Sequence, residues 1–115
     1  MRSSELRDLD SEGLKAMRAE LLRGLPSLET VLRGSLIERF LRCGKPGCRC
    51  ARGRGHGPKN YLSVSHPKGR PEMLYVTGDL AVRVQESLKV FAAVRHALDR
   101  ICAINTELLR RRERF

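Results

Sequence analysis

The stretch CGKPGCRCARGRGH, residues 43–56, holds three of the four cysteines and one of the three histidines of a 115-residue chain. Zinc in structural sites takes four tetrahedral ligands from Cys and His. The glycines of this stretch allow the backbone to wrap closely around an ion. The spacing therefore predicts a structural Zn²⁺ site with four ligands, Cys43, Cys48, Cys50 and His56. Two alternatives remain open: a loop of thiols without metal, and redox-active thiols with basic neighbours.

This stretch lies within a segment that contains no acidic residue. Between Glu38 and Glu72 there are nine Lys or Arg residues, whereas the net charge of the whole chain is +10. A localised excess of positive charge is typical of a surface that binds polyanions. A solvated basic surface is the alternative interpretation. The predicted nucleic-acid contacts are Arg42, Lys45, Arg49, Arg52, Arg54, Lys59, Lys68 and Arg70.

The segments on either side of residues 43–58 have the patterns of β-strands, whereas residues 43–58 are rich in Gly and Pro and are expected to be irregular. Residues 35–42 read as a strand, with a short helix as the alternative. Residues 60–66 and 72–76 read as a β-hairpin, with a loop at residues 67–71. Pairing of His66 with Glu72 would place four apolar side chains on one face, Leu62, Val64, Leu74 and Val76.

Helical patterns surround this β module. Apolar residues at spacings of three and four predict an N-terminal helix over about residues 11–25, which Pro26 ends. Residues 1–9 are expected to be frayed, and a long helix is expected over about residues 80–112. The predicted fold class is α+β, with a zinc-pinned three-stranded module over about residues 35–76. We expect one domain of 115 residues, made of a helical arm (1–33), a cysteine-rich basic β module (34–77) and the long helix (78–115).

The long helix carries a heptad pattern of apolar residues, which is typical of a coiled coil. Because the N-terminal helix is too short to cover this pattern, we expect the chain to form a homodimer. An intramolecular helical hairpin is the alternative. Asn105 occupies a seam position, where a polar residue can fix register. The predicted dimer seam comprises Val84, Leu88, Phe91, Val94, Leu98, Ile101, Asn105 and Leu108.

Four short motifs carry a resemblance to a known family. They are Gly34-Ser35-Leu36, RCGKPGCRCA at residues 42–51, His56-Gly57-Pro58 and Tyr61-Leu62-Ser63. Together they resemble an uncharacterised family of short prokaryotic proteins that are often found near transposase genes. The resemblance covers about residues 34–77. It implies that the cysteines act together and that the polyanion is mobile-element DNA, so that DNA is favoured over RNA.

The sequence favours some functional classes over others. It shows no nucleophile–base set and no carboxylate pair, so we expect a protein that is not an enzyme and takes no small-molecule substrate. The apolar runs are too short to span a bilayer, and the N-terminus has no apolar signal region, so we expect a cytoplasmic protein without a membrane partner. The preferred function is nucleic-acid binding, with a role as an accessory factor of a mobile element as its specific form. The alternative is a helical protein-interaction adaptor with a structural metal module.

Overall fold

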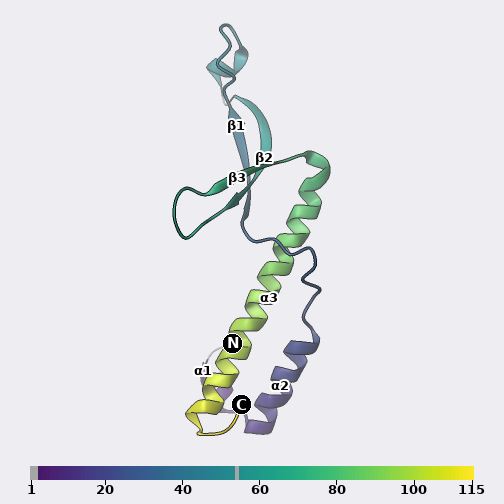
Figure 1. Cartoon of the computed structure of the whole chain (residues 1–115), viewed down its shortest axis with the longest axis vertical. Helices are drawn as coiled ribbons and strands as arrows, with labels where there is room; N and C mark the ends of the chain where they lie inside the picture. Colours follow the sequence, from purple (N-terminus) through teal and green to yellow (C-terminus); the bar gives the residue numbers. More distant parts are fainter. Residues whose placement is uncertain (1–2, 54) are drawn as a thin grey trace. The chain divides into compact units, whose positions relative to one another are not determined.

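A computed structural model describes residues 3–53 and 55–115, with the side chains of residues 5–49, 52–53 and 55–115. Figure 1 shows an N-terminal helical region, a small β-sheet and a long C-terminal helix, which confirms the predicted α+β class. In chain order the elements are α1 (Ser3–Arg7), α2 (Ser11–Arg23), β1 (Ser35–Leu41), the 3₁₀ helix η1 (Arg49–Arg52), β2 (His56–Val64), β3 (Glu72–Val76) and α3 (Gly78–Arg110).

The chain divides into two compact units. One consists of Met1–Glu29 and Val90–Phe115, and the other is Thr30–Lys89. Helix α3 therefore contributes its first turns to the unit that contains the sheet and its remaining turns to the helical unit.

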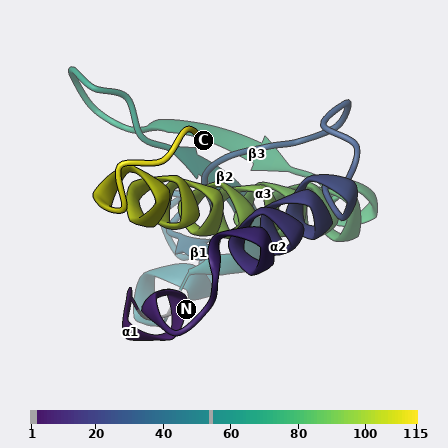
Figure 2. The same ribbon diagram turned by 90° about the horizontal axis from the view of Figure 1, so that it is seen from below.

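The helical unit is organised around the packing of α2 against the C-terminal part of α3 (Figures 1 and 2). Asp10 caps α2, because its Oδ1 accepts a hydrogen bond of 2.7 Å from the backbone N–H of Gly13. The two helices run antiparallel, since Arg18 of α2 donates to the Oδ1 of Asn105 while Ser11 contacts Arg111. The core of this unit consists of Leu6, Leu14, Ile104 and Leu108.

For residues 3–9 the expectation of fraying is wrong, because Ser3–Arg7 form helix α1. Residues 1 and 2 lie outside the described residues. Leu6 is only 2% exposed and belongs to the core. The guanidinium of Arg111 donates to the carbonyl oxygens of Leu6 (3.0 Å) and Leu9 (2.6 Å). A five-residue helix has little stability of its own, so its contacts with Arg111 and with the core residues Ile104 and Leu108 of α3 are what fix it.

Helix α3 presents two adjacent apolar stripes. One stripe is buried and contains Ala97, Ile104 and Leu108, and the polar Ser87 of the same helix is also buried. The predicted seam is divided between this stripe and the next. Leu108 lies in the chain's own core, Leu98 is exposed, and the other members are half-buried: Val84, Leu88, Phe91, Val94, Ile101 and Asn105. Contact of these residues with a second copy stays a prediction.

The sheet is antiparallel with the strand order β1-β2-β3. The predicted pairing of His66 with Glu72 is wrong: Val64 lies opposite Glu72, so the hairpin loop is longer than expected. His66 Nε2 still lies 3.2 Å from Glu72 Oε2 through the side chains. A shift of two residues keeps every side chain on its predicted face, and Leu62 and Val76 are buried on that face.

Regular structure also extends into the segment that we expected to be irregular. Residues 49–52 form η1, and β2 begins at His56 rather than at Asn60. Pro58 is tolerated in β2 because it lies beside the irregular register between Arg39 and Leu41, where a ladder hydrogen bond is not required. His56 is consequently held opposite Leu41, at the end of a paired strand.

Across the described residues, every helix falls short of the length or the apolar content needed to cross a bilayer.

Candidate metal centre

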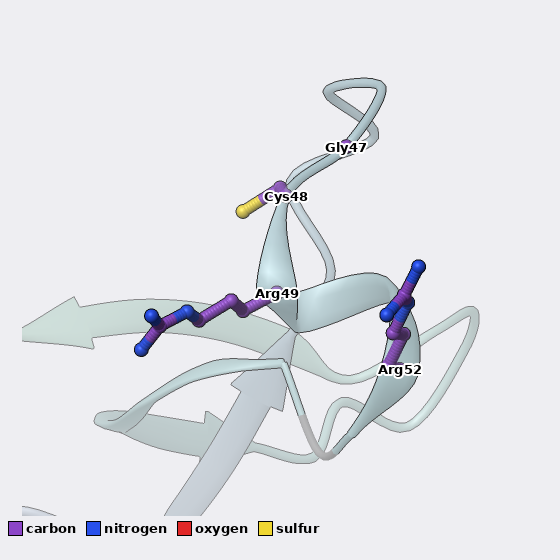
Figure 3. Close-up of a pocket in the computed structure, with 4 residues that line it drawn as sticks. All are labelled: Gly47, Cys48, Arg49 and Arg52. Atoms are coloured by element: carbon purple, nitrogen blue, oxygen red, sulfur yellow. The ribbon is translucent and has the colours of Figure 1, made fainter.

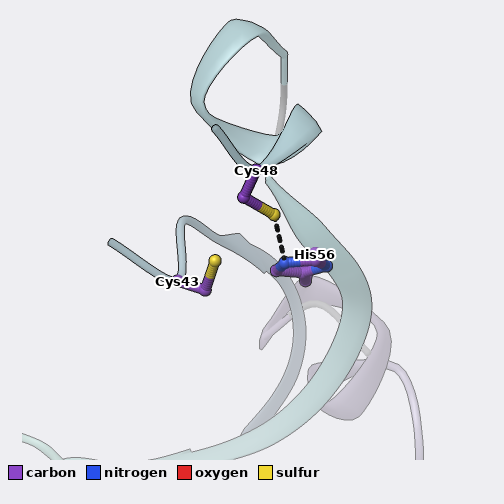
Figure 4. A group of neighbouring side chains, drawn as sticks. All are labelled: Cys43, Cys48 and His56. Atoms are coloured by element: carbon purple, nitrogen blue, oxygen red, sulfur yellow. Dashed lines mark hydrogen bonds between the residues drawn. The ribbon is translucent and has the colours of Figure 1, made fainter. Parts of the chain in front are cut away.

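The ligand atoms of Cys43, Cys48 and His56 lie within 4.8 Å of one another. The Sγ of Cys48 is 3.3 Å from the Nε2 of His56 (Figure 4). Cys43 follows the end of β1, Cys48 precedes η1 and His56 begins β2. Three separate elements thus bring these side chains together at the end of the β1–β2 pair, as the sequence predicts for these three residues.

A tight turn places Cys48. The backbone N–H of Cys48 donates to the carbonyl oxygen of Lys45 at 3.3 Å. Pro46 and Gly47 are the central residues of this turn, and Gly47 has φ of 76°. Proline at the first central position and a positive φ at the second are the features of a type II turn. The sequence Lys-Pro-Gly-Cys therefore directs the Cys48 thiol back toward Cys43 and His56.

A second glycine allows the loop to close next to the strand that it left. Gly55 has φ of 100°, and a Cβ at this position would lie 2.7 Å from the carbonyl carbon and oxygen of Leu41. Any other residue would push the returning chain away from β1. Because the next residue is His56, this close approach sets the distance between the imidazole and Cys43.

The donor set fits zinc. Ligand atoms at about 2.0–2.3 Å from a tetrahedral zinc ion are separated by about 3.3–3.8 Å. The separation of 3.3 Å between Cys48 and His56 already lies in this range, and the limit of 4.8 Å for the whole group requires only a small contraction. Two sulfur donors and one imidazole are the ligand types that zinc prefers over magnesium or calcium.

Two predicted site residues fall beyond what the structure describes. Cys50 is part of η1, but its side chain lies outside the described residues, as does Arg54. Their predicted roles, as the fourth ligand and as a phosphate contact, stay predictions.

The described basic side chains of the predicted nucleic-acid surface are all exposed, and all belong to the unit Thr30–Lys89. They are Arg42, Lys45, Arg49, Arg52, Lys59, Lys68 and Arg70. Arg42 also has a structural role, since its Nη2 lies 3.5 Å from the carbonyl oxygen of Gly53 across the loop. Sequence patterns did not indicate this role, because it depends on how the loop folds back.

A hollow of about 300 Å³ lies beside the cysteine cluster, lined by Gly47, Cys48, Arg49 and Arg52. Figure 3 shows the sulfur of Cys48 and the guanidinium of Arg49 extending to one side of the loop, while the guanidinium of Arg52 extends to the other. Positive charge therefore lies on both sides of η1, next to thiols that would become anionic on binding a metal.

Comparison with known proteins places the chain in a family. A family described as Domain of unknown function (DUF6788) matches residues 11–86. The chain belongs to this family. The family match includes α2, the complete sheet, the cysteine cluster and the first turns of α3, and it is wider than the segment of residues 34–77 that carries the sequence resemblance. A search of curated proteins and a search of solved structures found no match.

Proposed function

We propose that the chain is a non-enzymatic nucleic-acid-binding protein whose basic β module is shaped by a structural zinc ion. The observation that carries this proposal is the position of the Cys43–Cys48–His56 cluster at the end of the β1–β2 pair, among exposed basic side chains. The cluster lies within residues 39–71, which contain no Asp or Glu. Lys and Arg side chains on one surface neutralise phosphates and release counterions, which supplies binding free energy without sequence recognition.

Cys43, Cys48, Cys50 and His56 would hold the ion, and the ion would supply a cross-link between β1, η1 and β2. The type II turn and the close approach at Gly55 already bring three of these residues near one another. The cross-link would fix Lys45, Arg49 and Arg52, which lie on the same loop, relative to the sheet. The role of the metal is thus to order a basic surface. A catalytic zinc would also need a general base nearby, and residues 39–71 contain no Asp or Glu.

The choice of DNA over RNA, and a role as an accessory factor of a mobile element, are parts of this proposal that rest on the sequence resemblance alone.

A binding titration at several salt concentrations tests the proposal. If six to eight phosphates are neutralised, the logarithm of the binding constant should fall with the logarithm of salt concentration with a slope of about −5 to −7. The double variant Arg49→Glu, Arg52→Glu should bind more weakly and have a slope smaller in magnitude by about 2. The absence of binding to DNA or RNA at ~50 mM salt would contradict the proposal.

A matched control has the same change in net charge elsewhere in the chain. Arg95 and Arg114 are exposed and lie in the helical unit, outside the β module. The double variant Arg95→Glu, Arg114→Glu should retain a larger share of the affinity and of the salt dependence than the module variant. Equal losses in the two variants would show that only net charge matters.

A helical protein-interaction adaptor that dimerises through α3 is the second candidate. Its supporting observation is the apolar stripe on α3 that the chain itself leaves open, which includes Leu98 and Leu109. Their spacing is compatible with one helical face. In this case the charge reversals at Arg49 and Arg52 would leave the partner contact unchanged.

A further inference from the structure

One face of the β-sheet carries a row of apolar and aromatic side chains across all three strands. Ile37 lies opposite Tyr61, and Tyr61 lies opposite Tyr75. Residues directly opposite one another in an antiparallel sheet point to the same face. Ile37, Tyr61 and Tyr75 therefore form one row from β1 to β3, the strands labelled in Figure 1.

The aromatic members of this row remain accessible to solvent. The ring centroids of Tyr61 and Tyr75 are 5.6 Å apart, with 56° between the ring planes. Tyr75 is 58% exposed, whereas Leu62 and Val76, which belong to the other face, are 5% and 6% exposed. Leu74, which also belongs to the other face, is 45% exposed. It is therefore the exposure of Tyr75 itself, and of Arg39 and Lys59 in the neighbouring row, that leaves this face open to solvent. Tyr61 supports the Tyr75 ring from one side, and more than half of the Tyr75 surface is left for another partner.

The neighbouring row on the same face consists of two positive charges. Arg39 of β1 lies directly opposite Lys59 of β2, and both side chains are exposed. Like charges directly opposite each other destabilise a sheet, and residues 39–71 contain no acidic residue that could compensate. An anion bound between Arg39 and Lys59 would remove the repulsion.

The two rows are two residues apart along the strands, which corresponds to about 7 Å. A stacking surface and an anion site thus lie next to each other at a spacing comparable with the size of a nucleotide. A ligand that contacts both rows at once needs a flat π-face and, in the same molecule, a negatively charged group nearby. A base with its phosphate has this chemistry, and a fully paired duplex does not offer it, because its bases are stacked on one another.

We propose that this face of the sheet binds single-stranded nucleic acid, with a base stacked on Tyr75 and phosphate held by Arg39 and Lys59. This inference rests on the proposed function and names its substrate class. Tyr61 positions the ring of Tyr75, and Ile37 extends the apolar row toward β1. The remaining basic residues of the module then contact the backbone on either side of the stacked base.

Tyrosine fluorescence gives a direct readout of stacking, because the chain has two tyrosines and no tryptophan. The probes are a thymidylate oligomer and a uridylate oligomer of about ten nucleotides, and a DNA duplex of the same length. Both single strands should quench the fluorescence and bind more tightly than the duplex. The ratio of the two single-strand affinities distinguishes DNA from RNA as the preferred source.

Substitution of Tyr75 separates stacking from charge. Tyr75→Ala should lower the affinity for the thymidylate oligomer by about tenfold and remove most of the quenching, whereas Tyr75→Phe should retain the affinity. Phe115→Ala is the matched control, because Phe115 is an aromatic residue that is 64% exposed and lies outside the sheet. This control should change neither affinity nor quenching.

A substitution that removes one charge and keeps a similar side-chain length distinguishes a loss of binding from a loss of folding. Lys59→Gln should raise the thermal stability, because it removes the repulsion with Arg39, and should at the same time weaken single-strand binding by severalfold. An unfolded or loosened variant could not show both effects. A gain in stability without loss of binding would overturn the role of this row.

The inference and the proposed function can fail separately. If Tyr75→Ala binds single strands as well as Phe115→Ala does, while Arg49→Glu, Arg52→Glu abolishes binding, the sheet-face proposal is overturned and the proposed function stands. If the duplex binds as tightly as the single strands and also loses affinity on Tyr75→Ala, the single-strand assignment is overturned. If none of the three probes binds at low salt, the proposed function fails, and the inference fails with it.

Discussion

Glu107 is a charged residue that lies almost completely buried, with 4% of its surface exposed. Its carboxylate accepts hydrogen bonds from Arg110 Nη1 at 2.8 Å and from Arg111 Nε at 3.3 Å. Burial raises the pKa of Glu107, but the hydrogen bonds from Arg110 and Arg111 and the charges of both residues outweigh it and hold the pKa below the ordinary value of 4.5. Since Arg111 also donates to Leu6 and Leu9, the ionised carboxylate supports the attachment of α1.

A pH dependence of stability follows from the lowered pKa of Glu107. The stabilisation is fully present above the ordinary pKa of this carboxyl and is lost as the pH falls below about 4.5 and through the lower pKa of the folded state. Glu107→Gln should reduce the stability at neutral pH and flatten its decline in acid. The measurement is the urea midpoint between about pH 6 and pH 3.

Glu86→Gln is the matched control for this titration, because Glu86 is an exposed acidic residue of the same helix. This variant should retain the acid-dependent loss of stability. Identical slopes for Glu107→Gln and the unsubstituted chain would contradict the role of the Glu107 carboxylate.

At the scale of single residues, the metal ligands could be predicted because their chemistry is local. Cys43, Cys48 and His56 lie close together in sequence, and loops of this length with Gly and Pro can bring such residues together. The need for Gly55 could not be predicted, because it arises from contact with Leu41 of another strand. The pairing of Tyr61 with Tyr75 likewise becomes visible only with the strand register.

At the scale of secondary structure, periodicity predicted the helices α2 and α3 and the three strands, but tertiary contacts decided their limits. α1 has no apolar period of its own and depends on Arg111 and on the burial of Leu6. β2 begins at His56 because β1 provides a pairing partner there, despite the adjacent Pro58. Turn residues alone did not show that the β2–β3 loop starts at Ser65.

The α3 helix also shows why an apolar pattern does not identify its partner. Its apolar residues cover a wide arc, so that two neighbouring stripes both satisfy a heptad spacing. The structure uses the stripe with Ile104 and Leu108 for the chain's own core. Leu98 belongs to the neighbouring stripe and is 56% exposed.

Self-association of α3 can be tested with Leu98→Glu. If the exposed stripe forms a dimer, the unsubstituted chain should have twice the mass of one chain in light scattering, and the variant should have the mass of one chain, because a charge in a coiled-coil seam is costly. Leu22→Glu is the matched control, since Leu22 is 53% exposed and lies on α2. A monomeric unsubstituted chain, or a dimer that persists in Leu98→Glu, would refute this seam.

At the scale of the whole molecule, the two compact units differ in how their charged residues are arranged. The helical unit contains Glu107 and its paired arginines, where opposite charges stabilise packing. The unit Thr30–Lys89 contains the acid-free segment, in which positive charges lie close to one another without acidic residues. Such a segment costs stability through self-repulsion, and a metal cross-link with a polyanionic ligand would offset that cost.

The zinc content of the purified chain, measured by elemental analysis, tests the central claim of a metal-ordered basic module most directly. We expect about one zinc ion per chain, close to none in Cys48→Ser, and an unchanged content in Cys102→Ser. Cys102 is an exposed cysteine of α3 and serves as the matched control. A folded chain without bound metal, or zinc retained in full by Cys48→Ser, would contradict this claim.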